Sequence, residues 1–151
     1  MKPTSRTEVQ GLADALTLRA GSADDAPAAF WILSSRPTAV PIARHLTRVR
    51  LQLWRLPELV EAAELLVSEL VTNAVRHAGG HVRLTLTVDD GLMRCEVEDG
   101  GPLLLPAEGW YGRALLDALA CCWGTGRTDS GEVVWFEIPT ADRTRTEPVR
   151  G

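Results

Sequence analysis

The order of hydrophobic and polar residues changes its period along the chain, and these changes divide it into helices and strands. A short apolar run over residues 29–33 predicts a strand, and a turn over residues 34–37 follows it. The next segment predicts a helix because its apolar residues recur at helical spacing: Ile42, Leu46, Val49 and Leu53. Pro57 begins a second predicted helix, which ends near Gly79 and Gly80 and carries the stripe Val60, Ala63, Val67, Leu70, Val71 and Ala74.

Beyond Gly80 the period becomes two, which is typical of half-buried strands. Residues 82–88 and 92–98 alternate in this way on either side of a turn at Asp89, Asp90 and Gly91, and they predict a β-hairpin. The remaining predicted elements are a loop at 99–109, a helix at 113–120 and strands at 121–125 and 132–138. This order predicts an α+β fold, a two-layer sandwich of one mixed or antiparallel sheet with helices on one face.

All predicted elements lie in one block, residues 28–138, which suits a single domain with one hydrophobic core in a chain of 151 residues. Residues 1–27 and 139–151 are polar and weakly periodic, so we expect both to be disordered tails. No apolar run reaches the roughly 18 residues that a membrane-spanning helix needs. The N-terminal residues also lack the apolar region of a secretory signal, so we expect a cytoplasmic protein.

The charged residues argue against several function classes. A formal net charge of -4 does not suit nucleic-acid binding, because neutralising phosphates requires a concentrated basic face. Lys2 is the only lysine, which excludes the phosphate-binding lysine of a P-loop, the ATP-site lysine of eukaryotic-type kinases and a Schiff base. We expect the clustered arginines to face solvent, opposite the apolar stripe of their helix: Arg44, Arg48, Arg50 and Arg55.

The cysteines give no sign of a covalent framework or a metal site. There are three, Cys95, Cys121 and Cys122, without a CxxC pair or a zinc-ligand spacing. Because free cysteine is among the most buried residue types, we expect buried thiols at these positions.

Three polar residues mark the second predicted helix. Glu69, Asn73 and His77 are spaced by four residues, so they form one polar line beside the apolar stripe and can reach a common ligand. A glutamate can orient or deprotonate a nucleophile, and an amide oxygen suits magnesium, which takes few protein ligands. The alternative is a solvated helix face in which His77 caps or fills the helix end.

A second candidate follows the predicted hairpin, where a strand runs into Asp99, Gly100 and Gly101. An aspartate at a strand end can accept a hydrogen bond from an exocyclic amine, and glycines allow the backbone to approach a flat ring. The alternative is an ordinary turn, since aspartate and glycine are common in turns.

Together, and in this order, the two motifs resemble those of a known superfamily. Residues 64–78 resemble the N box of the GHKL superfamily (gyrase, heat-shock chaperone, histidine kinase and MutL), especially its anti-sigma-factor serine/threonine kinases of the RsbW and SpoIIAB type. Residues 99–102 resemble its adenine-binding DxG box. The resemblance covers residues 28–138 and includes Trp123-Gly124 and residues 134–137, which are similar to actinobacterial members. It implies a Bergerat-type ATP-binding fold.

The resemblance also implies roles for individual residues. It assigns Glu69 as the base that activates an attacking serine hydroxyl, Asn73 as the magnesium ligand and Asp99 as the acceptor for the adenine amino group. Gly101 is expected to pack under the adenine ring, and three further residues complete the expected nucleotide site: His77, Gly112 and Arg113. The implied cofactors are ATP and magnesium. The implied partners are a sigma factor, an anti-sigma-factor antagonist or both, and a second copy of the chain, with no direct contact to nucleic acid or membrane.

Two departures from the family pattern leave the activity open. Trp110-Tyr111-Gly112-Arg113 aligns with the family's lid motif, Gly-x-Gly-Leu or Gly-x-Gly-Phe, so tryptophan replaces one glycine and arginine replaces the apolar residue, which makes backbone approach harder. The alternative is that the alignment is off by a residue or two and that Arg113 compensates as a phosphate partner. Near the last strand Val133 stands where threonine is usual, and Glu132 adds a negative charge that disfavours triphosphate. The chain is therefore expected to be either an ATP-dependent protein-serine/threonine kinase or a degenerate binding module of the same fold that regulates a partner without phosphate transfer.

Overall fold

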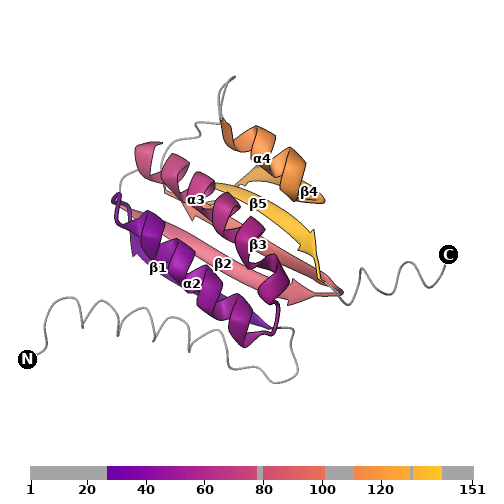
Figure 1. Ribbon diagram of the computed structural model, residues 1–151. Coiled ribbons are helices and arrows are strands. Elements are labelled where there is room, and N and C mark those ends of the chain that lie inside the picture. The colour runs from indigo at the N-terminus through magenta and orange to yellow at the C-terminus, as the bar shows by residue number, and fades with distance from the viewer. Residues whose placement is uncertain (1–26, 78–79, 101–110, 130, 141–151) are drawn as a thin grey trace, which may run out of the picture.

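The computed structural model describes residues 27–77, 80–100, 111–129 and 131–140, in which helices lie over one face of a single sheet (Figure 1). The elements in chain order are β1 (Ala28–Ser34), α2 (Ala39–Leu53), the short 3₁₀ helix η1 (Pro57–Leu59), α3 (Val60–His77), β2 (His81–Asp89), β3 (Leu92–Asp99), α4 (Tyr111–Leu119), β4 (Cys122–Arg127) and β5 (Glu132–Pro139). The predicted order of elements and the predicted α+β class are confirmed. β5 ends at Pro139, so the ordered block continues one residue into the range predicted to be a tail.

The sheet has five strands in the order β1-β2-β3-β5-β4, and all neighbouring pairs are antiparallel. Its centre is the predicted hairpin, in which Asp90 and Gly91 have φ of 55° and 75°. Positive φ at both positions is what a two-residue type I′ turn requires, and this turn matches the twist of the strands. β1 and β4 form the two edges.

The strands alternate between a buried face and an open face. The buried face carries the core side chains of the central strands: Val82, Leu84, Leu86, Met93, Cys95, Val97, Val134, Phe136 and Ile138. Each large side chain that is fully buried, such as Phe136, contributes about 1.5–3 kcal/mol. The open face, which lies away from the helices, carries polar pairs such as Arg94 with Glu96 and Glu137.

The helices cover the buried face because their apolar stripes match it. α3 packs on β2 and β3, α2 packs beside α3, and α4 lies next to β4 (Figure 1). The predicted stripe of α3 is confirmed, since all of it is buried except Val60, which is half-buried and packs against the core.

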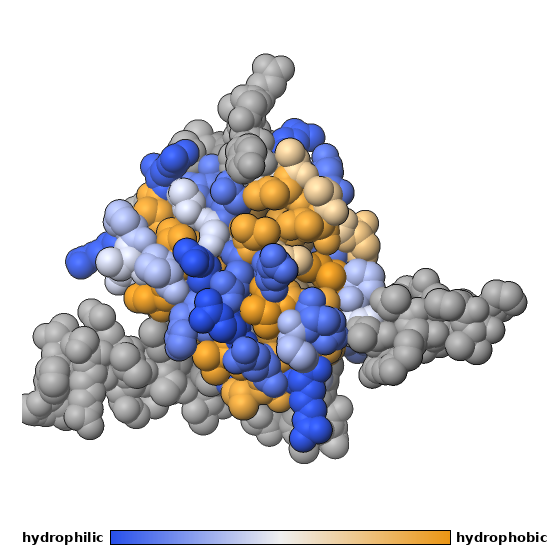
Figure 2. Space-filling model, viewed as in Figure 1, coloured by the Kyte–Doolittle hydropathy of each residue, from blue (hydrophilic) through white to orange (hydrophobic). Residues whose placement is uncertain are grey.

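The predicted stripe of α2 is wrong except at Leu46, which is half-buried and packs against the core. Its buried face consists of Ala39, Ala43, Thr47 and Leu51, two of which are small enough to let the helix lie close to the sheet. Ile42, Val49 and Leu53 are 37%, 38% and 61% exposed. Hydrophilic side chains gather over α2 and α3 along the centre of this face (Figure 2).

The arginines of this region follow the prediction with one exception. Arg44, Arg48 and Arg55 are exposed. Arg50 is half-buried instead, with its guanidinium 5.5 Å from the ring of Trp54, and burial lowers its pKa.

The cysteine prediction holds at one position of three. Cys95 is buried in β3, but Cys121 and Cys122 are exposed. The reason is their place in the fold, at the start of an edge strand that has a neighbour on one side alone. None of the helices in the described part of the chain is long and apolar enough to cross a membrane. Residues 1–26 and 141–151, predicted to be tails, lie outside the described residues.

Candidate functional site

The polar line on α3 lies where the sequence places it. Glu69 and Asn73 are half-buried beside the buried stripe, and His77 is the last residue of the helix. Because the Glu69 and Asn73 side chains are only partly exposed, they do not fit the alternative of a fully solvated helix face. Glu69 and Asn73 are one helical turn apart, which allows both to reach one ligand.

Asp99 lies at the same end of the sheet as the end of α3. It is the last residue of β3 and is directly opposite Val82 in β2. Since α3 ends at His77 and the chain enters β2 at His81, the end of α3 and Asp99 meet at this end of the sheet. Directly opposite residues of antiparallel strands share a face, so Asp99 is on the helix-covered face with the buried Val82. The structure therefore places the end of α3 and Asp99 at the same end of the sheet.

Glu132 shares this face and this end. It is directly opposite Asp99 on β5, and its side chain is 5% exposed. Val133 pairs with Glu98 on the open face. Glu132, and not Val133, is therefore the β5 residue on the side of Asp99, which corrects the comparison made from the sequence. Counting back in steps of two from the buried Phe136 gives the same result and would have found it.

The turn between β4 and β5 lies directly against Asp99. A Cβ atom added to Gly131 would lie 1.8 Å from the backbone oxygen of Asp99, so only glycine allows this approach. The hydroxyl of Thr128 donates to Glu98 at 2.6 Å and accepts from the backbone N–H of Gly131 at 3.0 Å. These bonds fix the turn to the end of β3 and hold the backbone around Asp99 in place.

Only part of the expected lid lies within the described residues. Gly112 is buried in the first turn of α4, whereas Arg113 is exposed and its guanidinium lies 5.6 Å from the ring centre of Trp123 in β4. The indole N–H of Trp123 donates to Asp117 at 2.8 Å, which ties β4 to α4. Arg113 thus lies on the contact between α4 and β4. Gly101 and Trp110 lie outside the described residues.

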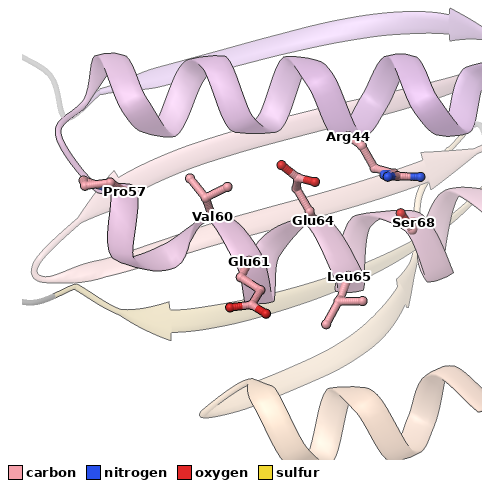
Figure 3. Close-up of a pocket in the computed structure, with 7 residues that line it drawn as sticks. All are labelled: Arg44, Pro57, Val60, Glu61, Glu64, Leu65 and Ser68. Atoms are coloured by element: carbon pink, nitrogen blue, oxygen red, sulfur yellow. The ribbon is translucent and has the colours of Figure 1, made fainter.

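A groove of about 620 Å³ lies elsewhere, between α2 and α3, and none of the candidate residues lines it. Val60 and Glu64 project from α3 toward α2, whereas Glu61 and Leu65 project away from it (Figure 3). Arg48 of α2 donates two hydrogen bonds to the Glu64 carboxylate, at 2.5 and 3.1 Å. The bond from Arg48 lowers the pKa of Glu64. This ion pair links the two helices.

The chain can be assigned to a family on sequence. The sequence model of the histidine kinase-like ATPase domain matches residues 33–109, more than half of the chain, including α3 and Asp99. This chain belongs to the histidine kinase-like ATPase domain family. A comparison with curated protein sequences gives no match.

Solved structures of this family share the fold. The chain is similar to the RsbU and RsbW domains of Rv1364c from Mycobacterium tuberculosis, with a TM-score of 0.62 and 20% identity over 76% of this chain and 32% of that chain. It is also similar to the Erythrobacter litoralis EL346 blue-light activated histidine kinase, with a TM-score of 0.50 and 32% identity over 59% of this chain and 33% of that chain. The chain matches about a third of the length of each of these proteins. The resemblance to histidine kinase-like ATPases that the sequence motifs carry is confirmed.

Proposed function

We propose that this chain is an ATP-binding regulatory protein that acts as a protein-serine/threonine kinase. One observation carries the proposal: α3, which bears Glu69 and Asn73, covers the face of the sheet that carries Asp99 and ends at the same end of that sheet, in a histidine kinase-like ATPase domain. The site combines a base, a hard amide ligand and an acceptor for an amine, which are the groups that positioning a nucleotide and a hydroxyl nucleophile requires.

In this proposal each element contributes one part of the site. Asp99 accepts a hydrogen bond from the adenine amino group, and Gly101 lies under the ring. Glu69 removes the proton of the attacking serine hydroxyl. His77, Gly112 and Arg113 lie around the phosphates. The sole lysine, Lys2, makes a lysine-dependent phosphate site impossible within the domain.

Magnesium fits this donor set as an ion held mainly by the nucleotide. The described residues contain no group of three His, Cys, Asp or Glu side chains placed to hold a metal. Asn73 offers one half-buried amide oxygen, which suits an ion that keeps several waters and is shared with substrate phosphates. We propose Asn73 as the protein ligand, with magnesium neutralising charge on the phosphates when bound.

The proposed partners follow from the same family resemblance. They are a sigma factor, an anti-sigma-factor antagonist that carries the phosphorylated serine, or both, with a homodimer as the working form and the cytoplasm as the location. A neighbour that contains an RsbW domain supports this proposal at the level of fold.

A second candidate function is a binding module without phosphate transfer. Glu132 favours it, because a carboxylate that is 5% exposed lies directly opposite Asp99, beside the proposed nucleotide. Like charges on facing positions weaken a site for an anionic ligand.

Phosphate transfer tests the choice between the two functions. The chain is incubated with magnesium-ATP and the anti-sigma-factor antagonists of its organism, and phosphoserine is measured by mass spectrometry. Glu69→Gln keeps the shape of the side chain and removes its basicity, so transfer is expected to fall by about 10²- to 10⁴-fold while nucleotide affinity stays the same.

The matched control is Glu61→Gln, which removes an exposed carboxylate two turns earlier on α3 and is expected to leave transfer unchanged. Equal transfer by Glu69→Gln and the unmodified chain would remove Glu69 from the mechanism. Nucleotide binding without transfer to any antagonist would favour the binding module.

A further inference from the structure

Two adjacent cysteines form a cluster that the nucleotide site does not use. Cys121 and Cys122 are both exposed, and their sulfur atoms lie 3.3 Å apart. The Cys122 thiol also donates to the Glu137 carboxylate at 3.3 Å. Two thiols and a carboxylate therefore meet on the surface, where α4 ends and β4 begins.

The environment distinguishes the two sulfurs. The hydrogen bonds with Cys121 and Glu137 raise the pKa of Cys122 to about 12, so this thiol keeps its proton. The Glu137 carboxylate also pairs with the guanidinium of Arg94 at 3.0 Å, which holds it beside the thiol as a hydrogen-bond acceptor. Only the Cys122 thiol has its proton on a carboxylate, so Cys121 is placed to attack first and Cys122 to resolve the product.

We propose that Cys121 and Cys122 form a reversible redox site that small-molecule disulfides convert to a vicinal disulfide. The Cys121 thiolate attacks one sulfur of the small disulfide, forms a mixed disulfide and expels one small thiol. Cys122 then loses its proton to water and attacks the Cys121 sulfur, which expels the second small thiol. In total, two protein thiols and one small disulfide give one protein disulfide and two small thiols.

The fold places the two sulfurs close enough to form the disulfide and makes that disulfide easy to reduce. The sulfurs must approach by only about 1 Å to reach bonding distance. Neighbouring Cα atoms are about 3.8 Å apart, below the range of about 4.4–6.8 Å that ordinary disulfides span, so the ring is strained and easily reduced. Because β4 is an edge strand, closure disturbs pairing on one side alone, where the backbone N–H of Cys121 donates to the Glu137 backbone oxygen at 2.9 Å.

The ring closed by the Cys121–Cys122 disulfide would also lie next to the hydrogen bond that ties β4 to α4. Trp123 directly follows Cys122 and holds α4 through its bond to Asp117. Oxidation at the two cysteines is therefore placed to alter the position of α4.

Peptide mapping tests the proposal on the full native chain. The protein is treated with glutathione disulfide, blocked with iodoacetamide, denatured and cleaved with trypsin. Cleavage after Arg94, Arg113 and Arg127 places both exposed cysteines in the peptide 114–127 and Cys95 in the peptide 95–113. We expect peptide 114–127 to lose two hydrogens and to carry neither label nor glutathione, and dithiothreitol to restore two alkylatable thiols.

Cys95 is the internal control, because it is buried and is expected to stay reduced throughout. Variants test the order of attack. Cys122→Ser is expected to trap glutathione on Cys121, whereas Cys121→Ser is expected to react more slowly than Cys122→Ser. Three results for peptide 114–127 of the unmodified chain would overturn the proposal. They are full alkylation of both thiols, glutathione that stays attached, and a disulfide that links two copies of the chain. Equal rates for the two variants would overturn the assigned order.

Discussion

Among single residues, one glycine and one glutamate next to Asp99 decide the shape and charge of the candidate site. Gly131 allows the β4–β5 turn to touch the backbone of Asp99, and Glu132 places a second carboxylate on the same face. Both positions belong to β5 or its turn, far from Asp99 in sequence. Each can be tested against a neighbouring position that lacks the contact.

Gly131→Ala is expected to destabilise the chain and displace the end of β3. Its Cβ would lie 1.8 Å from the Asp99 oxygen, so the turn must move, and such overpacking costs about 1–3 kcal/mol. Gly126→Ala is the control, since its Cβ would meet Val133 at an ordinary 3.6 Å. Urea denaturation of both variants measures the free energy of unfolding. Equal losses would show that the close approach at Gly131 is unimportant.

Glu132→Gln is expected to raise ATP affinity. Adenine presents an acceptor nitrogen beside its donor amine, and an amide can donate to that nitrogen where a carboxylate repels it. One gained hydrogen bond contributes about 0.5–1.5 kcal/mol, or about two- to tenfold in affinity. Val133→Thr, on the open face, is the control and is expected to change nothing. A larger effect of Val133→Thr, measured by fluorescent-nucleotide titration, would contradict the assigned faces.

At the scale of elements, the sequence predicted the strands, the central turn and α3 because each carries its own period or turn residues. It failed for the buried face of α2, where Ala39, Ala43 and Thr47 lie inward and larger apolar side chains lie outward. Hydrophobicity alone cannot show this, because close helix packing selects small residues rather than the most apolar ones. It also predicted the α3 and Asp99 motifs, but not which face of β5 meets them, since that depends on strand register.

The α2–α3 contact gives a pH-dependent prediction. The hydrogen bond from Arg48 lowers the pKa of Glu64, so the pair stabilises the fold above the ordinary glutamate pKa of about 4.3 and the contribution is lost as pH falls through the lowered value. Glu64→Gln is therefore expected to lower the denaturation midpoint at neutral pH and to match the unmodified chain in strong acid. Glu58→Gln, an exposed carboxylate in η1, is the control. A deficit that persists unchanged in acid would show that the ion pair is not its cause.

At the scale of the whole molecule, the functions proposed here occupy separate parts of one fold. The end of α3, the end of β3 and the β4–β5 turn meet at one end of the sheet and form the candidate nucleotide site. The Cys121 and Cys122 pair lies at the start of the edge strand β4, which the bond from Trp123 to Asp117 ties to α4. We expect a nucleotide to bind at the first of these places, against Asp99.

Calorimetric titration with magnesium-ATP and magnesium-ADP tests this binding, using the unmodified chain, Asp99→Ala and Glu96→Ala. The two variants each remove a carboxylate from β3, but Glu96 lies on the open face, where it pairs with Arg94 and not with the β4–β5 turn. We predict nucleotide binding by the unmodified chain, a loss of about 1–3 kcal/mol for Asp99→Ala, which is about 5- to 150-fold in affinity, and little change for Glu96→Ala. No binding by the unmodified chain, or equal losses in both variants, would contradict this prediction.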